Sequence, residues 1–144
     1  MRFVITGLPR CRTAWWAAYL TQGDVFCFHE ASYMDADYRI PFKHKGNSEA
    51  GVPDTFLESF DPQKIVIVHR DIDEVYRSLE IIGQPVRPGY LEELEERNTK
   101  LEGLHVDFYN IDLDEVHTYL ELPGYSPERA KLFENMNVQS KYWR

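Results

Sequence analysis

The chain has 144 residues, 43% of them hydrophobic, which is enough apolar material for one compact domain over residues 1–144 and too little for two. Its formal net charge of −8 argues against general binding to DNA or RNA, because such proteins depend on clustered lysines and arginines. No apolar run is long enough to cross a bilayer, and the chain does not open with a secretory signal pattern. We therefore expect a cytoplasmic protein in which Cys11 and Cys27 are free thiols.

The first half of the chain predicts short strands that alternate with short helices. Residues 2–5 form an apolar strand, residues 6–13 a turn that carries two arginines, and residues 14–20 a helix. The segments that follow are a strand at 24–28, a helical turn at 31–37, an extended segment at 38–45 that is the candidate for a third strand, a loop at 46–49, and a short helix at 53–60.

The second half repeats this alternation around its clearest strand, residues 64–68, whose continuous β-branched run is typical of a parallel sheet covered on both faces. The remaining elements are a helix at 72–82 capped by Asp71, a loop at 83–89, an acidic surface helix at 90–101, a strand at 104–109, a helix at 113–120 capped by Asp112, and a last helix that opens at Ser126-Pro127. The pattern predicts an α/β fold, a three-layer sandwich with a mainly parallel central sheet.

The turn after the first strand has the features of an anion site. A strand that turns directly into a helix leaves the first N–H groups of the helix unpaired, with the positive end of the helix dipole behind them. Arg10 and Arg12 add charge, Thr13 adds a hydroxyl, and Gly7 and Pro9 shape the turn. A phosphate or sulfate group is the natural ligand, but the second glycine and the lysine of the nucleotide-triphosphate loop are missing, so ATP is not expected.

Further polar side chains follow the other strands. His29 and Glu30 come after the second strand, and Arg70 comes after the strand at 64–68. Ligands of parallel α/β sheets bind beyond the carboxyl ends of the strands. We therefore expect these side chains and Arg10 to lie along one edge of the sheet.

Two stretches resemble the sulfotransferase family, in particular its short bacterial and phage-type members. Residues 9–15, Pro-Arg-Cys-Arg-Thr-Ala-Trp, are similar to the family's 5′-phosphosulfate loop, although Cys11 replaces a serine and Arg12 a glycine. Residues 68–78 are similar to its 3′-phosphate motif, an arginine at a strand end with a serine eight residues later, here Arg70 and Ser78. The Arg-Lys-Gly element that many larger members carry near the C-terminus is absent from the sequence.

The resemblance implies a P-loop-type fold that transfers a sulfuryl group from 3′-phosphoadenosine-5′-phosphosulfate to a hydroxyl or amine, leaving adenosine 3′,5′-bisphosphate. It implies Arg10 as a catalytic cation and Glu30 as the general base, with His29 as the second choice. The residues expected to bind the donor nucleotide are Pro9, Arg10, Cys11, Arg12, Thr13, Ala14, Arg70 and Ser78. The acceptor is a small molecule, a saccharide or a peptide, and a homodimer would supply the cover that so short a chain lacks.

Two alternatives remain beside this prediction. A non-catalytic nucleotide or phosphate binder of the same fold would follow if Arg12, in place of glycine, blocks transfer. Cys11, between two arginines at a helix N-terminus, is expected to have a lowered pKa and to be a reactive thiolate. A cysteine-dependent phosphatase is disfavoured because Ala17 stands where its arginine is needed. No metal is expected, since His105 and His117 lack the spacing of zinc ligands.

Overall fold

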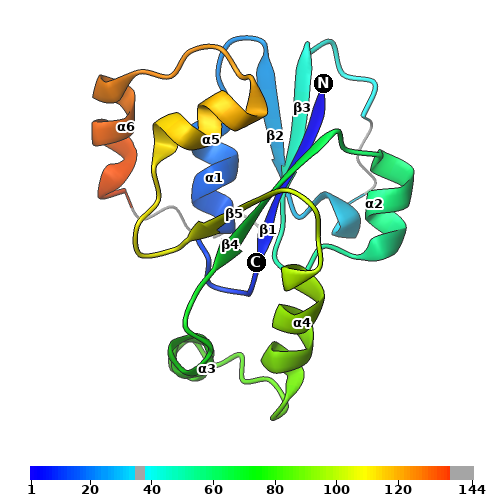
Figure 1. The fold of residues 1–144 in the computed structure, drawn as a ribbon, viewed down its shortest axis with the longest axis vertical. Coiled ribbons are helices and arrows are strands. Elements are labelled where there is room, and N and C mark those ends of the chain that lie inside the picture. Colours follow the sequence, from blue (N-terminus) through cyan, green and yellow to red (C-terminus); the bar gives the residue numbers. More distant parts are fainter. Residues whose placement is uncertain (35–37, 137–144) are drawn as a thin grey trace.

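The computed structural model describes residues 1–34 and 38–136. Within these residues, five strands pair in parallel to form one sheet with the order β2-β3-β1-β4-β5 (Figure 1). The strands are β1 (Arg2–Gly7), β2 (Val25–His29), β3 (His44–Ser48), β4 (Lys64–His69) and β5 (Leu104–Asp107). Because every pair is parallel, all strands end at one edge of the sheet, the carboxyl edge, and begin at the opposite amino edge. The prediction of an α/β fold with a parallel sheet is confirmed.

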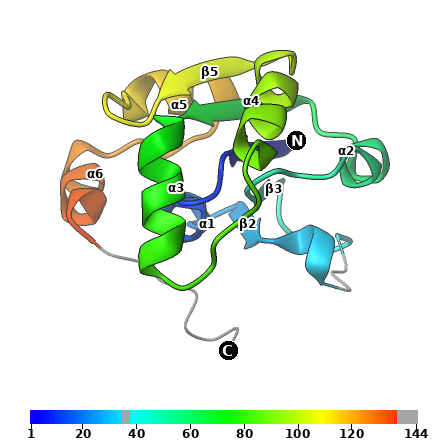
Figure 2. The ribbon, with the colours of Figure 1, turned by 90° about the horizontal axis from the view of Figure 1, so that it is seen from below.

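Six α-helices and one short 3-10 helix flank the sheet in the described part of the chain. They are α1 (Thr13–Leu20), η1 (Ala31–Tyr33), α2 (Asp54–Phe60), α3 (Ile72–Ile81), α4 (Tyr90–Thr99), α5 (Leu113–Leu120) and α6 (Pro127–Glu134). Figure 1 shows α1, α5 and α6 on one side of the sheet, α2 on the other, and α3 and α4 near the carboxyl edge. Viewed from that edge in Figure 2, α3 and α4 stand in front of the strand ends. No helix among the described residues is long and apolar enough to span a bilayer.

The core divides into two clusters because successive side chains of a strand point to opposite faces. Phe3 and Ile5 of β1 pack in the larger cluster with Trp16 of α1, whereas Val4 packs in the smaller cluster with Phe56 of α2. All four residues from Phe3 to Thr6 are at most 1% exposed, so β1 is covered on both faces. This central position of β1 fixes the loop that follows it in the middle of the carboxyl edge.

Three of the six α-helices in the described residues begin with the predicted side-chain cap. The Asp71 carboxylate accepts a hydrogen bond from the N–H of Glu74 at 2.9 Å, and the carboxylate of Asp112 caps α5 in the same way. The Ser126 hydroxyl caps α6, with a proline in its first turn. These side chains satisfy N–H groups that have no partner inside the helix. The three predicted caps are confirmed.

The third strand is where the prediction was wrong. Residues 46–49 were expected to form a loop, but Gly46, Asn47 and Ser48 are buried in β3, and the N–H of Glu49 donates to the Ile5 carbonyl at 3.0 Å. A strand of polar residues fits here because the Phe3 ring lies against Gly46. A Cβ added to Gly46 would come within 2.2 Å of that ring. The strand therefore depends on a tertiary contact and not on the apolar pattern that predicts strands.

Other boundaries differ by a few residues. The helical turn expected at 31–37 is the 3-10 helix Ala31–Tyr33, and residues 35–37 lie outside the described part. The last strand ends at Asp107 rather than at Tyr109, because the chain turns at 108–110. The acidic helix α4 exposes most of its polar side chains, as expected, but buries Leu91 and Asn98.

Candidate anion-binding site at the carboxyl edge

The loop between β1 and α1, residues 8–12, is held tightly against the neighbouring strand. A Cβ on Gly7 would lie 2.5 Å from the Val68 carbonyl oxygen of β4, so the close approach of the two backbones requires glycine at this position. Leu8 and Cys11 are buried, at 0% and 1% exposure, and anchor the loop in the larger core cluster. The exposed residues between and after these anchors are the two arginines.

Both arginines adopt the left-handed backbone conformation, with φ of 64° at Arg10 and at Arg12. This region is costly for residues with a Cβ and is concentrated at sites where the surrounding structure imposes it. Arg12 is the N-cap residue of α1 and contributes no side-chain hydrogen bond to it. The first-turn N–H groups of α1 thus lack the side-chain cap that three of the other described helices have.

The Arg12 side chain turns away from the carboxyl edge toward α6. Its guanidinium lies 4.7 Å from the centre of the Trp15 ring, and Nη2 donates to the backbone carbonyls of Glu134 and Met136 at 3.4 and 3.3 Å. The indole N–H of Trp15 donates to the Phe133 carbonyl at 2.8 Å. Arg12 therefore caps the end of α6, where cations are favoured, and does not join the other arginines.

Arg10, Arg70 and Ser78 come together although they are far apart in the sequence. The Nη1 atom of Arg70 donates to the backbone carbonyl of Arg10 at 2.5 Å, and the Nε atom of Arg10 donates to the Ser78 hydroxyl at 3.1 Å. Arg70 follows β4 and Ser78 lies in α3, so two strand ends and one helix contribute to the group. We call these three residues the arginine cluster.

Three residues that the sequence did not single out surround Arg70 and hold it in place. Glu74 Oε1 accepts from Nη2 and Nε of Arg70 at 2.5 and 3.2 Å, and Glu74 Oε2 accepts from the Tyr109 hydroxyl at 2.5 Å. The Phe108 ring centre lies 4.3 Å from the Arg70 guanidinium. The hydrogen bonds from Tyr109 and Arg70 lower the pKa of Glu74. The spacing of four residues between Arg70 and Glu74 could have indicated the pair, whereas nothing local predicts Tyr109.

His29 and Glu30 lie at the end of β2, and His29 contacts the first residue of α1. The Nε2 atom of His29 is 3.2 Å from the Thr13 hydroxyl and 3.8 Å from Glu30 Oε1. Glu30 leaves the strand in the left-handed conformation, with φ of 57°, and its carboxylate lies beside the His29 ring. The His29 side chain is only 7% exposed and the Glu30 side chain 45%, so Glu30 is the more accessible base.

Burial separates the two candidate bases further. It lowers the pKa of His29, although the carboxylates of Glu30 and Glu49 oppose this change. Glu49 itself is 1% exposed, and its carboxylate accepts from the Ser32 N–H and hydroxyl and from the Asn47 amide. The buried Glu49 carboxylate therefore stabilises η1, the short helix that follows β2.

Cys11 is a buried, protonated thiol and not the reactive thiolate that the sequence predicted. Burial raises the pKa of its thiol to about 12, and the nearby Arg70 cation lowers it too little to compensate. Burial also raises the pKa of Cys27. Both cysteines are free thiols, as expected. The lowered pKa was predicted from the helix terminus and the arginines alone, but the side chain points into the core.

The remaining residues that were predicted to bind the donor are Pro9 and Ala14. Pro9 precedes Arg10 in the loop and Ala14 lies in the first turn of α1, both half-buried. Among the described residues, no group of three or more histidine, cysteine, aspartate or glutamate side chains is placed to hold a metal ion.

No protein family model, curated protein or solved structure matches this chain. What the structure establishes is an α/β fold with a five-stranded parallel sheet in the described residues. Any function must therefore be argued from the residues at the carboxyl edge.

Proposed function

We propose that the protein is a sulfotransferase of the three-layer, P-loop type, which uses 3′-phosphoadenosine-5′-phosphosulfate as donor. The observation that carries this proposal is the arginine cluster, in which Arg10 bonds to Ser78 and Arg70 bonds to the backbone of Arg10. The two sequence motifs that resemble donor-binding motifs of that family thus meet at one place. They do so at the carboxyl edge, where ligands of parallel α/β sheets bind.

The residues of the cluster suit a ligand with two anionic groups. The guanidinium of Arg70 offers a planar fork of N–H donors and is 14% exposed, and the Ser78 hydroxyl lies two turns along α3. These two residues fit a 3′-phosphate. The exposed Arg10, with the first-turn N–H groups of α1, fits the phosphosulfate end, where charge accumulates during transfer.

The chemistry would be an in-line displacement at sulfur. An acceptor O–H or N–H forms a new bond to sulfur, the bond from sulfur to the bridging phosphate oxygen breaks, and the electron pair leaves with the phosphate. In this reaction Arg10 stabilises the negative charge on the transferring and bridging oxygens. Glu30 accepts the proton of the acceptor, because it is the exposed carboxylate at the end of β2.

His29 has a positioning role in this scheme. Its contact with the Thr13 hydroxyl links the end of β2 to the first residue of α1. The same ring lies beside Glu30 and keeps that carboxylate near the start of the helix. His29 thus holds the base and the anion-binding helix terminus at a fixed separation.

A non-catalytic nucleotide binder of the same fold is the alternative. Two features of Arg12 favour this alternative. Arg12 adopts a left-handed conformation in which a glycine would be unstrained, and its guanidinium donates to the end of α6 and not to a ligand. In that case the arginine cluster binds nucleotide but no group is transferred.

Adenosine 3′,5′-bisphosphate tests the binding half of the proposal. It should raise the thermal midpoint of the wild type and have little effect on Arg70→Ala or Ser78→Ala. Arg77→Ala is the matched control, because Arg77 is an exposed arginine on the same helix that is not part of the cluster. An equal shift in Arg77→Ala and Arg70→Ala, or no shift in the wild type, would reject the site.

Transfer of labelled sulfate tests the catalytic half. The labelled donor is incubated with a panel that contains a phenol, an amine, a saccharide and a tyrosine peptide. Label on any acceptor, lost in Arg10→Ala, supports a sulfotransferase. Bisphosphate binding without transfer to any member of the panel supports the binder.

A further inference from the structure

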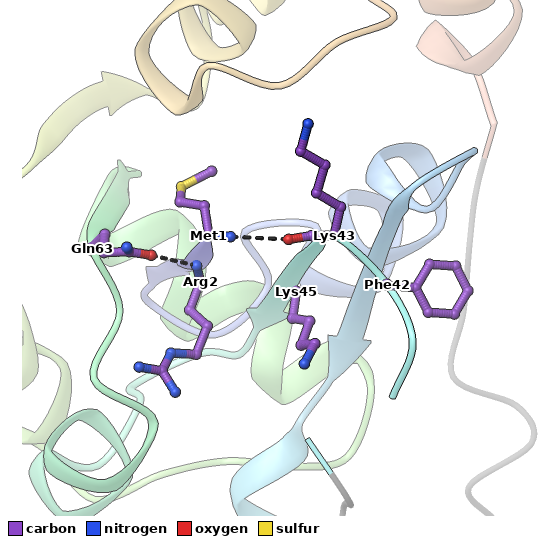
Figure 3. A pocket seen from close by; sticks show the side chains of 6 residues that line it. All are labelled: Met1, Arg2, Phe42, Lys43, Lys45 and Gln63. Carbon is purple, nitrogen blue, oxygen red and sulfur yellow. Dashed lines mark hydrogen bonds between the residues drawn. The ribbon is translucent and has the colours of Figure 1, made fainter. Parts of the chain in front are cut away.

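A second cationic site lies at the amino edge of the sheet, at the other end of β1 from the arginine cluster. It is a pocket of about 260 Å³ lined by Met1, Arg2, Phe42, Lys43, Lys45 and Gln63 (Figure 3). Three of these side chains are cationic, in a chain with 24 acidic and 16 basic side chains. The local charge is therefore opposite in sign to the charge of the whole chain.

The sheet itself forces two of these cations together. Arg2 of β1 and Lys45 of β3 are direct partners in the strand register. Their side chains leave the two strands in the same direction, and Lys43 extends the other way (Figure 3). Like charges at opposed positions of a strand pair repel each other and destabilise the sheet. A bound anion would turn this repulsion into attraction.

The protein supplies little negative charge to balance this pair. Asp61 lies 3.9 Å from Arg2, but the two side chains are 84% and 46% exposed, so water screens the ion pair. Neither Lys43 nor Lys45 forms an ion pair with any residue that the structure describes. Two of the three cations are thus available to a ligand.

The remaining contacts preorganise the rim of the pocket. Gln63 Oε1 accepts from the backbone N–H of Arg2 at 2.7 Å, which leaves the amide nitrogen of Gln63 as a donor. The amino group of Met1 donates to the Lys43 carbonyl at 2.9 Å and ties the two segments together. Burial lowers the pKa of the adjacent His44, and the cations of the amino terminus and Lys43 lower it further, against the opposing effect of Asp24. Burial is the main cause of this change, and the neighbouring cations act in the same direction.

We propose that the amino-edge pocket binds a small oxyanion of the phosphate or sulfate class, held between the Arg2 guanidinium and the Lys45 ammonium. The Gln63 amide contacts the same ligand from the rim, and Lys43, whose side chain extends the other way, adds positive charge nearby. A divalent tetrahedral anion fits two adjacent cations better than a monovalent carboxylate, because it neutralises both and accepts several hydrogen bonds at once. This site is separate from the arginine cluster and does not depend on the proposed transfer reaction.

Amide NMR titration of the full chain tests this proposal with sulfate, phosphate and acetate as separate probes, each against sodium chloride at equal ionic strength. We expect saturable shifts at Arg2, Lys45 and Gln63 with sulfate and phosphate, in the wild type and in Arg70→Ala alike. Arg2→Gln with Lys45→Gln should weaken binding at this site at least about tenfold, because two charge-assisted contacts are lost. Phosphate binding at the arginine cluster would instead shift signals near Arg70 and disappear in Arg70→Ala.

Lys45→Gln alone gives a second, independent readout. Without added anion this variant should melt at a higher temperature than the wild type, because the repulsion between positions 2 and 45 is gone, and sulfate should stabilise it less. Equal shifts with chloride, equal affinity for acetate, or undiminished sulfate binding in the double variant would overturn the proposal.

Discussion

The carboxyl and amino edges of the sheet both gather basic side chains, but they hold them in different ways. At the carboxyl edge, Arg70 is fixed by Glu74, by the Arg10 carbonyl and by the Phe108 ring. At the amino edge, Lys45 faces Arg2 across a strand pair and forms no ion pair within the described residues.

This difference bears on what each edge can do. Cations that are held by protein groups before a ligand arrives cost little reorganisation, which suits the stabilisation of a transition state. Arg2 and Lys45 are held less firmly by protein groups and can adjust to a ligand, which suits reversible binding of a small anion. The comparison predicts that changes at the carboxyl edge alter catalysis, whereas changes at the amino edge alter anion binding alone.

The largest effect is expected for Arg10→Ala. Arg10 would stabilise the negative charge that develops on the transferring and bridging oxygens. Its loss should lower kcat about 10²- to 10³-fold, because such stabilisation acts mainly in the transition state. Steady-state rates of sulfate transfer measure it, with Arg2→Gln as the control from the amino edge. If the two variants lose activity equally, the proposed division of labour between the edges is wrong.

Glu30→Gln should follow, with a loss of about 10²-fold or more in kcat if Glu30 is the general base. The glutamine keeps the size of the side chain and removes its ability to take a proton. Unchanged rates in Glu30→Gln together with a large loss in His29→Gln would assign the base to His29.

Glu74→Gln is expected to act in the opposite direction. Glu74 holds the Arg70 guanidinium but also neutralises its charge. A glutamine keeps an oxygen that accepts from Arg70 and removes the negative charge that competes with a phosphate, so binding of adenosine 3′,5′-bisphosphate should tighten several-fold. Isothermal titration measures the change in Kd, and Glu80→Gln, an exposed position on the same helix, is the control. Weaker binding in Glu74→Gln would mean that the carboxylate positions Arg70 rather than competing for it.

The pH dependence of stability should reflect the buried His117, which is 4% exposed and whose Nε2 lies 3.0 Å from the Tyr19 hydroxyl. Burial lowers its pKa, so the unfolded state takes up a proton first as the pH falls. The free energy of unfolding should thus fall below about pH 6.5, by at most about 1.4 kcal/mol per pH unit from this group. Urea unfolding at a series of pH values from about 7.5 downward measures this free energy. Its dependence on pH should be weaker in His117→Gln than in the wild type.

The smallest effect is expected for thiol modification. With the pKa of Cys11 raised to about 12 by burial, a thiol reagent near neutral pH should modify neither Cys11 nor Cys27 in the folded protein. Both should react after unfolding in urea. Fast modification of Cys11 in the native protein would restore the reactive-thiolate alternative.

How much the sequence predicted depends on the range of the interactions involved. The strands β1 and β4 and the helix caps at Asp71, Asp112 and Ser126 follow from local apolar runs and side-chain chemistry, so they were predictable. The strand β3 was placed wrongly because its burial depends on the Phe3 ring against Gly46, a contact between distant residues.

The site shows the same limit. The carboxyl-edge rule predicted that Arg10 and Arg70 would lie along one edge of the sheet, and there Arg70 donates to the Arg10 carbonyl. It did not predict that Arg12 turns to α6 or that Glu30 bends back toward His29, because backbone conformation decides both. Nor does any local pattern predict that Arg97 of α4 pairs with Asp54 at 2.7 Å, because these two residues are far apart in the sequence.

The most direct test of the central claim is the affinity for adenosine 3′,5′-bisphosphate, measured by isothermal titration in the wild type, Arg70→Ala, and the double variant Arg2→Gln with Lys45→Gln. The account predicts binding in the wild type, binding about 10- to 100-fold weaker in Arg70→Ala, and unchanged affinity in the double variant. Binding that survives in Arg70→Ala and is lost in the double variant would contradict it, because the nucleotide would then sit at the amino edge.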